Sequence, residues 1–97
     1  MTATSGKIGG WTLKNLDTAV EDKFVLYSRT TDAGVGMAST SFATDPMFYA
    51  GYTGKGDTPW DQGAGWKNYT NFYVDRNGHM FCNNATIKGT LQADTVL

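Results

Sequence analysis

Apolar and polar residues alternate without interruption over residues 85–94, near the end of the chain. One side of this segment carries Ala85, Ile87, Gly89, Leu91 and Ala93, and the other side carries only polar residues. A period of two is typical of a β-strand with one buried face. Gly89 weakens an isolated strand unless another backbone comes close to it, and a long unpaired apolar edge favours aggregation. The sequence therefore predicts a strand that packs closely against further copies of itself.

Three parallel copies of this strand can turn Ile87 and Leu91 toward a common axis. Gly89 and Ala85 then leave the room that the larger side chains need. The predicted axis positions of a homotrimer are Ala85, Ile87, Gly89, Leu91 and Ala93. The alternative is an internal strand of a monomeric sandwich, in which Gly89 marks a β-bulge.

The rest of the chain favours a small all-β fold. Signals for helices are nearly absent, and β-branched and aromatic residues form short runs that Gly, Asp and Asn interrupt. A chain of 97 residues buries only about 60–65% of its unfolded surface, so oligomerisation would help it. We expect an antiparallel β-sandwich-like domain over residues 1–82, and a trimerising β-segment over residues 83–97 that leads to a further module or to the chain end.

Composition argues against several classes of partner. The net charge is -1, from 8 basic and 9 acidic residues, and no basic stripe of the kind that binds phosphates is present. The sequence has neither a polybasic tract nor an apolar run of about 18 residues. Neither nucleic acid nor a membrane is expected to be a partner. The lone Cys82 cannot form an internal disulfide.

The central runs predict strands and one clear hairpin. Gly9 and Gly10 are expected to bend the first run, which covers residues 7–13. Asn77-Gly78 separates two apolar runs, which is the strongest short-range signal for a β-hairpin. The residues predicted to form the core are Ile8, Trp11, Phe24, Leu26, Phe48, Phe72, Val74 and Met80.

Residues 51–71 are predicted to form a long loop rich in glycine and aromatic residues. A loop of more than about 12–15 residues is usually functional or disordered, and Trp60 and Trp66 argue against disorder. Flat aromatic faces can stack on a pyranose ring while short polar side chains bind its hydroxyls. The candidate glycan-binding residues are Tyr52, Trp60, Trp66, Tyr69, Asp57 and Asp61. Alternatively, the two tryptophans only pack against a small core and so hold the loop in place.

No catalytic residue, cofactor or metal site is predicted. His79 and Cys82 are three residues apart, so a regular strand points them to opposite faces, and the sequence holds no other His or Cys to complete a site. Asp57, Asp61 and Asp75 could be considered as the carboxylate pair of a glycoside hydrolase. Gly or Pro lies near each of them, which favours a role in turns. We therefore do not expect an enzyme.

Four segments carry a further combined pattern. They are Ile8–Leu13 with its IGGW start, Phe48–Gly51, Phe72–Met80, and Asn84–Ala93 with the spacing N-A-x-I-x-G-x-L-x-A. In this order they resemble modules of bacteriophage and prophage tail proteins, including tail-tip, tail-associated lysin and tail-fibre proteins. The resemblance covers both ends of the chain.

The resemblance implies homotrimers along a fibre or tail axis, with the closing segment intertwined. It also implies a place in the virion after assembly in the bacterial cytoplasm, contacts with other tail or baseplate proteins, and a structural part in attachment to the host cell. The alternative interpretation is a receptor-binding tip, whose loop 51–71 contacts a bacterial surface polysaccharide.

Overall fold

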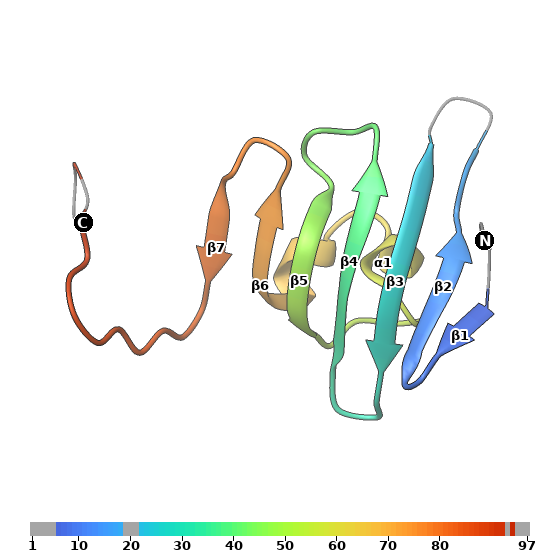
Figure 1. The fold of residues 1–97 in the computed structure, drawn as a ribbon, viewed down its shortest axis with the longest axis horizontal. Helices are drawn as coiled ribbons and strands as arrows, with labels where there is room; N and C mark the ends of the chain where they lie inside the picture. Colours follow the sequence, from blue (N-terminus) through green and yellow to red (C-terminus); the bar gives the residue numbers. More distant parts are fainter. Residues whose placement is uncertain (1–5, 19–21, 93, 95–97) are drawn as a thin grey trace.

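The computed structural model describes residues 6–18, 22–92 and 94, and the described chain forms one antiparallel sheet (Figure 1). Its seven strands follow one another in the order of the sequence. They are β1 (Gly6–Ile8), β2 (Trp11–Asn15), β3 (Lys23–Arg29), β4 (Gly34–Thr40), β5 (Pro46–Tyr52), β6 (Thr70–Asp75) and β7 (Met80–Cys82). The all-β prediction is confirmed.

Glycines form the turns at the two ends of the sheet. Gly9, with φ +61°, turns β1 back onto β2, so the predicted bend is a complete hairpin. Gly78, with φ +83°, lies in the connection between the antiparallel strands β6 and β7. The hairpin predicted at Asn77-Gly78 is confirmed, because a residue without a Cβ adopts a positive φ at little cost.

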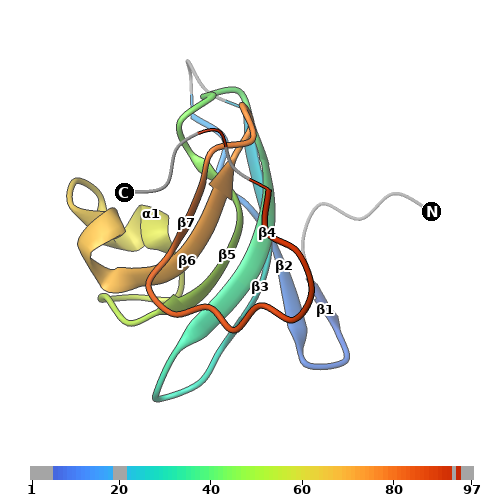
Figure 2. The ribbon, with the colours of Figure 1, turned by 90° about the vertical axis from the view of Figure 1, so that its left-hand side faces the viewer.

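The long connection between β5 and β6 is shorter than predicted and contains two short helices. Tyr52 belongs to β5 and Thr70 begins β6, so the connection covers residues 53–69. It includes α1 (Pro59–Gln62) and the 3-10 helix η1 (Trp66–Tyr69). Both helices lie on the same side of the curved sheet (Figure 2).

The core lies between the sheet and this connection. Its buried members are Val25, Tyr27, Tyr49 and Tyr52, with Leu16, Ala38, Trp60 and Tyr73 packed against them. Tyr27, Gly36, Tyr49 and Tyr73 are successive cross-strand partners. We call this side of the sheet the covered face.

Tyr49 is the centre of the core. Its ring meets those of Tyr52 and Trp60 edge to face, with centroids 6.4 Å apart in both pairs. Gly36 makes room for it, because a Cβ on Gly36 would lie 2.8 Å from the Tyr49 hydroxyl. That buried hydroxyl has no hydrogen-bond partner among the described residues. Burial raises the pKa of Tyr49, because ionisation would place a charge in an apolar environment.

The core predicted from the sequence is wrong in one specific way. The predicted residues do share a face, but it is the face opposite to that of Val25 and Tyr27, and neither α1 nor η1 covers it. Ile8, Phe48 and Met80 are 66%, 53% and 68% exposed. Alternation places residues on the same side of a strand, but it does not say which side the chain covers. We call this second side the open face.

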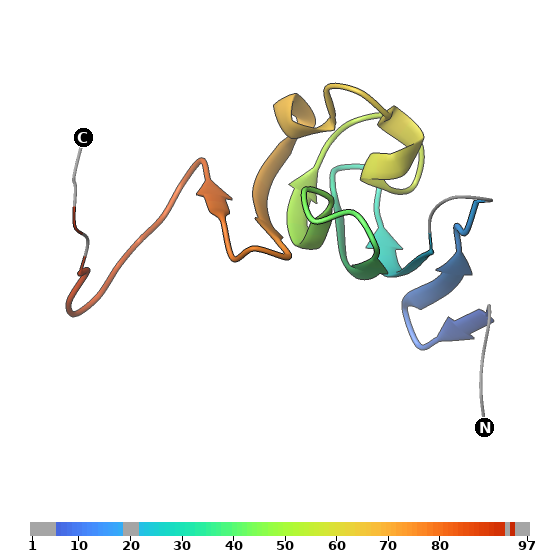
Figure 3. The ribbon, with the colours of Figure 1, turned by 90° about the horizontal axis from the view of Figure 1, so that it is seen from above.

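Residues 83–92 form a tail that leaves the sheet after β7 and runs away from it (Figures 1 and 3). The strand predicted here is not formed within the single chain. A strand needs a hydrogen-bonding neighbour. Asn83, at the start of the tail, still donates a backbone hydrogen bond to Asn71 of β6, but residues 84–92 pair with no strand among the described residues. Gly89 has φ +102°, outside the usual range of a strand. Ala93 and residues 95–97 lie outside the described residues.

Candidate functional site

The open face carries a continuous apolar ladder. Leu13, Leu26, Met37, Phe48, Val74 and Met80 are successive register partners from β2 to β7. A parallel row contains Val35, Ala50 and Phe72, which pair across β4, β5 and β6. Large side chains therefore lie next to one another across almost the whole width of the sheet.

These side chains surround a shallow hollow near the middle of the open face. Its volume is about 410 Å³, and its lining includes Trp11, Leu26, Val35, Met37, Phe48 and Phe72. Met37 and Phe48 remain 48% and 53% exposed at its edge. Aromatic residues and methionine are enriched in protein–protein interfaces. The open face thus has the composition of a protein interface.

The tail exposes a second apolar surface. Ile87 is 55% exposed and Leu91 is 65% exposed. Ala85 and Gly89 are also exposed, and a Cβ on Gly89 would meet nothing within 4 Å in the single chain. Four of the five predicted axis positions are therefore accessible to a partner, and the fifth, Ala93, lies outside the described residues.

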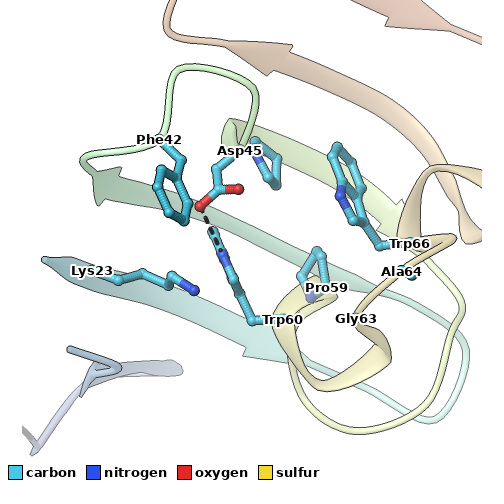
Figure 4. A pocket seen from close by; sticks show the side chains of 9 residues that line it. Lys23, Phe42, Asp45, Pro59, Trp60, Gly63, Ala64 and Trp66 are labelled. Atoms are coloured by element: carbon cyan, nitrogen blue, oxygen red, sulfur yellow. Dashed lines mark hydrogen bonds between the residues drawn. The ribbon is translucent and has the colours of Figure 1, made fainter. Parts of the chain in front are cut away.

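A separate pocket of about 370 Å³ lies on the covered side, between the 53–69 connection and the ends of β3 and β5. Trp60 and Trp66 stand on either side of it with Pro59 between them (Figure 4). Asp45 and Pro46, where the β4–β5 connection enters β5, also line it. We call it the tryptophan pocket.

Polar contacts hold the Trp60 side of this pocket in place. Trp60 Nε1 donates a hydrogen bond of 3.2 Å to Asp45 Oδ2, which also accepts a bond of 2.8 Å from Thr40 Oγ1. Lys23 Nζ lies 5.4 Å from the Trp60 ring centroid, a cation–π contact. Trp66 packs edge to face against Tyr73, with centroids 4.8 Å apart.

The structure does not bring the predicted glycan-binding residues together. Of the six predicted residues, only Trp60 and Trp66 line the tryptophan pocket. Tyr52 is fully buried, and its hydroxyl donates to the Lys55 carbonyl, so it cannot contact a ligand at the surface. Tyr69 is 44% exposed but lies outside the pocket.

Both acidic residues of that set have structural roles. Asp61 Oδ2 accepts hydrogen bonds from the backbone N–H groups of Asp57 and Thr58, and so closes the first turn of α1. Asp57 Oδ2 lies 3.4 Å from the Tyr27 hydroxyl. Burial and this carboxylate together raise the pKa of Tyr27. These contacts agree with the interpretation of the aspartates as turn residues.

Four residues from outside the 53–69 connection also line the pocket and were not predicted as site residues: Lys23, Phe42, Asp45 and Pro46. Asp45-Pro46 had a sequence signal, because the pair predicts a corner. Nothing in the sequence shows that this corner lies beside Trp60, because only the tertiary structure brings the two connections together.

The remaining polar groups form local turn contacts. Asp75 Oδ1 accepts hydrogen bonds from the backbone N–H groups of Asn77 and His79, and its Oδ2 lies 3.3 Å from His79 Nδ1. Desolvation raises the pKa of Asp75, but the contacts with His79 and Asn77 outweigh it, so the pKa is lowered overall. Over residues 6–18, 22–92 and 94, no cluster of three metal-binding side chains occurs. In the same part of the chain, no helix has the length and apolar character needed to span a membrane.

Comparison with known proteins adds no family. No protein-family model matches the chain, and searches of curated proteins and of solved structures give no significant match.

Proposed function

We propose that this chain is a structural, trimer-forming module of a bacteriophage or prophage tail-fibre or tail-tip protein. In this proposal it belongs to the virion, assembles in the cytoplasm of the bacterial host, and contacts other tail or baseplate proteins. Its contribution to host attachment is mechanical rather than catalytic: it holds three chains in register.

One observation carries the proposal: residues with the pattern of a core occupy the face that their own chain leaves open. An antiparallel sheet with one face in water normally alternates apolar and polar residues. Here Leu26, Met37 and Phe48 pair across the open face while Val25 and Tyr49 are buried on the other. Apolar surface of this extent is stabilised when another layer removes it from water. Neighbouring subunits would supply that layer and complete a β-sandwich-like core.

The tail supports the threefold arrangement. Its apolar residues recur with a period of two, and Ile87 and Leu91 are exposed in the single chain. Three tails that run in parallel would bury both residues at a common axis, and Gly89 and Ala85 would allow the backbones to approach. Each tail would also gain strand partners for residues 84–92, which pair with no strand in the single chain. The resemblance to tail modules supports the same intertwined trimer.

Light scattering on the purified chain tests this proposal. We expect a mass three times the chain mass of 10.5 kDa at micromolar protein concentrations. A well-folded species with the mass of a single chain at that concentration would contradict the proposal.

A pair of double variants tests the role of the tail. Ile87→Asn with Leu91→Asn places polar groups at the axis, and we expect dissociation, because burial of an unpartnered amide is unfavourable. The matched control, Thr86→Asn with Thr90→Asn, changes the other side of the same segment and should remain trimeric. Equal effects of the two pairs would show that the alternation does not define an axis.

A further inference from the structure

We infer that the tryptophan pocket binds one uncharged pyranose ring of an oligosaccharide. This inference goes beyond the proposed structural function and does not depend on the trimer. The open face and the tail carry the assembly, whereas this pocket lies on the covered side, beside α1 and η1. A module that assembles through its open face would leave the pocket accessible.

The size and the walls of the pocket suit a sugar ring. Its volume of about 370 Å³ is at the small end of ligand pockets, which measure roughly 300–1,000 Å³. Pro46 and Pro59, which also line the pocket, are almost fully buried. The accessible apolar surfaces are therefore provided mainly by the indoles of Trp60 and Trp66, which face the pocket from either side (Figure 4). The C–H groups on one side of a pyranose can pack on such surfaces. Both indoles are held by edge-to-face contacts with core tyrosines, so little order has to be gained on binding.

The polar groups of the pocket suit hydroxyl groups. Both side-chain hydrogen bonds to Asp45, from Trp60 and Thr40, reach Oδ2. The other carboxylate oxygen, Oδ1, accepts none from the described residues, so it can accept a bond from a sugar hydroxyl. The lining includes one basic and one acidic side chain, Lys23 and Asp45. Their opposite charges favour a neutral sugar over a strongly acidic one.

A proline-rich peptide is the main alternative occupant, because aromatic grooves also bind polyproline helices. Such a peptide presents carbonyl groups, which require donors, and it has almost no N–H or O–H groups to donate. In this pocket the Trp60 indole N–H already donates to Asp45, and Asp45 itself is an acceptor. The available carboxylate oxygen therefore matches a hydroxyl-rich ligand better than a carbonyl-rich one.

The chain contains three tryptophans, which makes nuclear magnetic resonance a direct test. Trp60 and Trp66 line the pocket, whereas Trp11 lies on the open face and serves as an internal control. We would titrate the ¹⁵N-labelled protein with cellotriose, chitotriose and mannotriose, and separately with a decaproline peptide. The inference predicts that at least one trisaccharide shifts the indole signals of Trp60 and Trp66 in a saturable way, while the Trp11 signal stays in place.

Three results of the titration would overturn the inference. The first is the absence of any shift with all three trisaccharides at millimolar concentrations. The second is a saturable shift with decaproline but not with the sugars, which would assign the pocket to a peptide. The third is an equal shift of Trp11, which would indicate contact without a defined site. None of these results bears on the trimer, whose test is the mass in solution.

Two variants and a matched control locate the site. Trp66→Ala should weaken the binding of the best trisaccharide by at least about tenfold, because it removes an aromatic anchor. Asp45→Asn retains the shape of the side chain and should weaken binding by about tenfold, because bonds to charged acceptors are the stronger ones. Tyr69→Ala removes an aromatic ring from the same connection but outside the pocket, and binding should be unchanged. Circular dichroism confirms that each variant is folded, and unchanged affinity in folded Asp45→Asn and Trp66→Ala would exclude this pocket.

Discussion

The most direct prediction concerns Phe48, at the centre of the open face. Replacement of Phe48 by Ser removes a side chain that is 53% exposed in the single chain. An aromatic side chain buries roughly 150–250 Å² when fully covered, so about 100 Å² of Phe48 is available to a partner. At about 25 cal/mol per Å², the loss amounts to about 2.5 kcal/mol per subunit.

This loss should weaken the assembly, whereas the part of Phe48 that its own chain covers affects the stability of the single chain. In a trimer, three subunits lose the contact together, so the protein concentration at half-dissociation should rise by roughly two to three orders of magnitude. The free energy of unfolding of the dissociated chain should fall by about 2 kcal/mol, because its own chain covers the rest of the Phe48 side chain. Analytical ultracentrifugation across a concentration series measures the first quantity, and urea denaturation of the dilute chain measures the second.

Phe42 provides a matched control for this prediction. It is the same residue type and is 49% exposed, but it lies in the β4–β5 connection beside the tryptophan pocket. Phe42→Ser should leave the concentration at half-dissociation unchanged. If Phe48→Ser also leaves it unchanged, or if both substitutions raise it equally, the open face is not the interface.

Four further predictions concern stability. Tyr49→Phe removes a buried hydroxyl that has no partner among the described residues, and it should stabilise the fold by about 1 kcal/mol. Tyr52→Phe removes a hydrogen bond, and it should destabilise the fold by about 1 kcal/mol. Urea denaturation measures both changes in the free energy of unfolding. Because the folded pKa values of both tyrosines are raised, stability should be complete below pH about 10 and fall above it, and Tyr49→Phe should reduce that fall in alkaline melting curves. Gly36→Ala should lower the free energy of unfolding by about 1–3 kcal/mol in the urea assay, because its Cβ would lie 2.8 Å from the Leu26 backbone oxygen in β3 and from the Tyr49 hydroxyl. An unchanged free energy of unfolding would indicate a looser core. The pKa of Asp75 is lowered in the folded chain, so its contribution to stability is present above pH about 4 and is lost as the pH falls further. The thermal midpoint of the Asp75→Asn variant should therefore depend less on pH in this range than that of the parent chain. An unchanged pH dependence would contradict this prediction.

Local patterns were sufficient for much of the fold. Runs of β-branched and aromatic residues indicated most of the strands, and Asn77-Gly78 indicated the β6–β7 hairpin that the structure contains. The predicted core residues, such as Leu26 and Phe48, do lie on one face. These predictions succeed because the period of side chains along a strand, and the φ range open to glycine, are properties of neighbouring residues.

Prediction of the candidate site was only partly possible. Trp60 and Trp66 were identified as important because large aromatic residues in a glycine-rich connection need a structural or binding role. Asp45 and Lys23 could not be assigned to the same pocket, since they lie far from the tryptophans in the sequence. The tertiary structure brings them together where the 53–69 connection crosses the ends of β3 and β5.

The sequence by itself determined which residues lie on the same side of each strand, where the chain turns, and that the tail has one apolar side. It did not determine which side of the sheet the chain covers. Neighbouring side chains of a strand point to opposite faces. In β3 both faces carry apolar residues, so Val25 and Leu26 are equally good candidates for burial. The tertiary structure decided between them, because Trp60 of α1 packs against the core that contains Val25 and Tyr49. Leu26 and its neighbours remain on the open face, because the single connection 53–69 can cover only one side of a seven-stranded sheet.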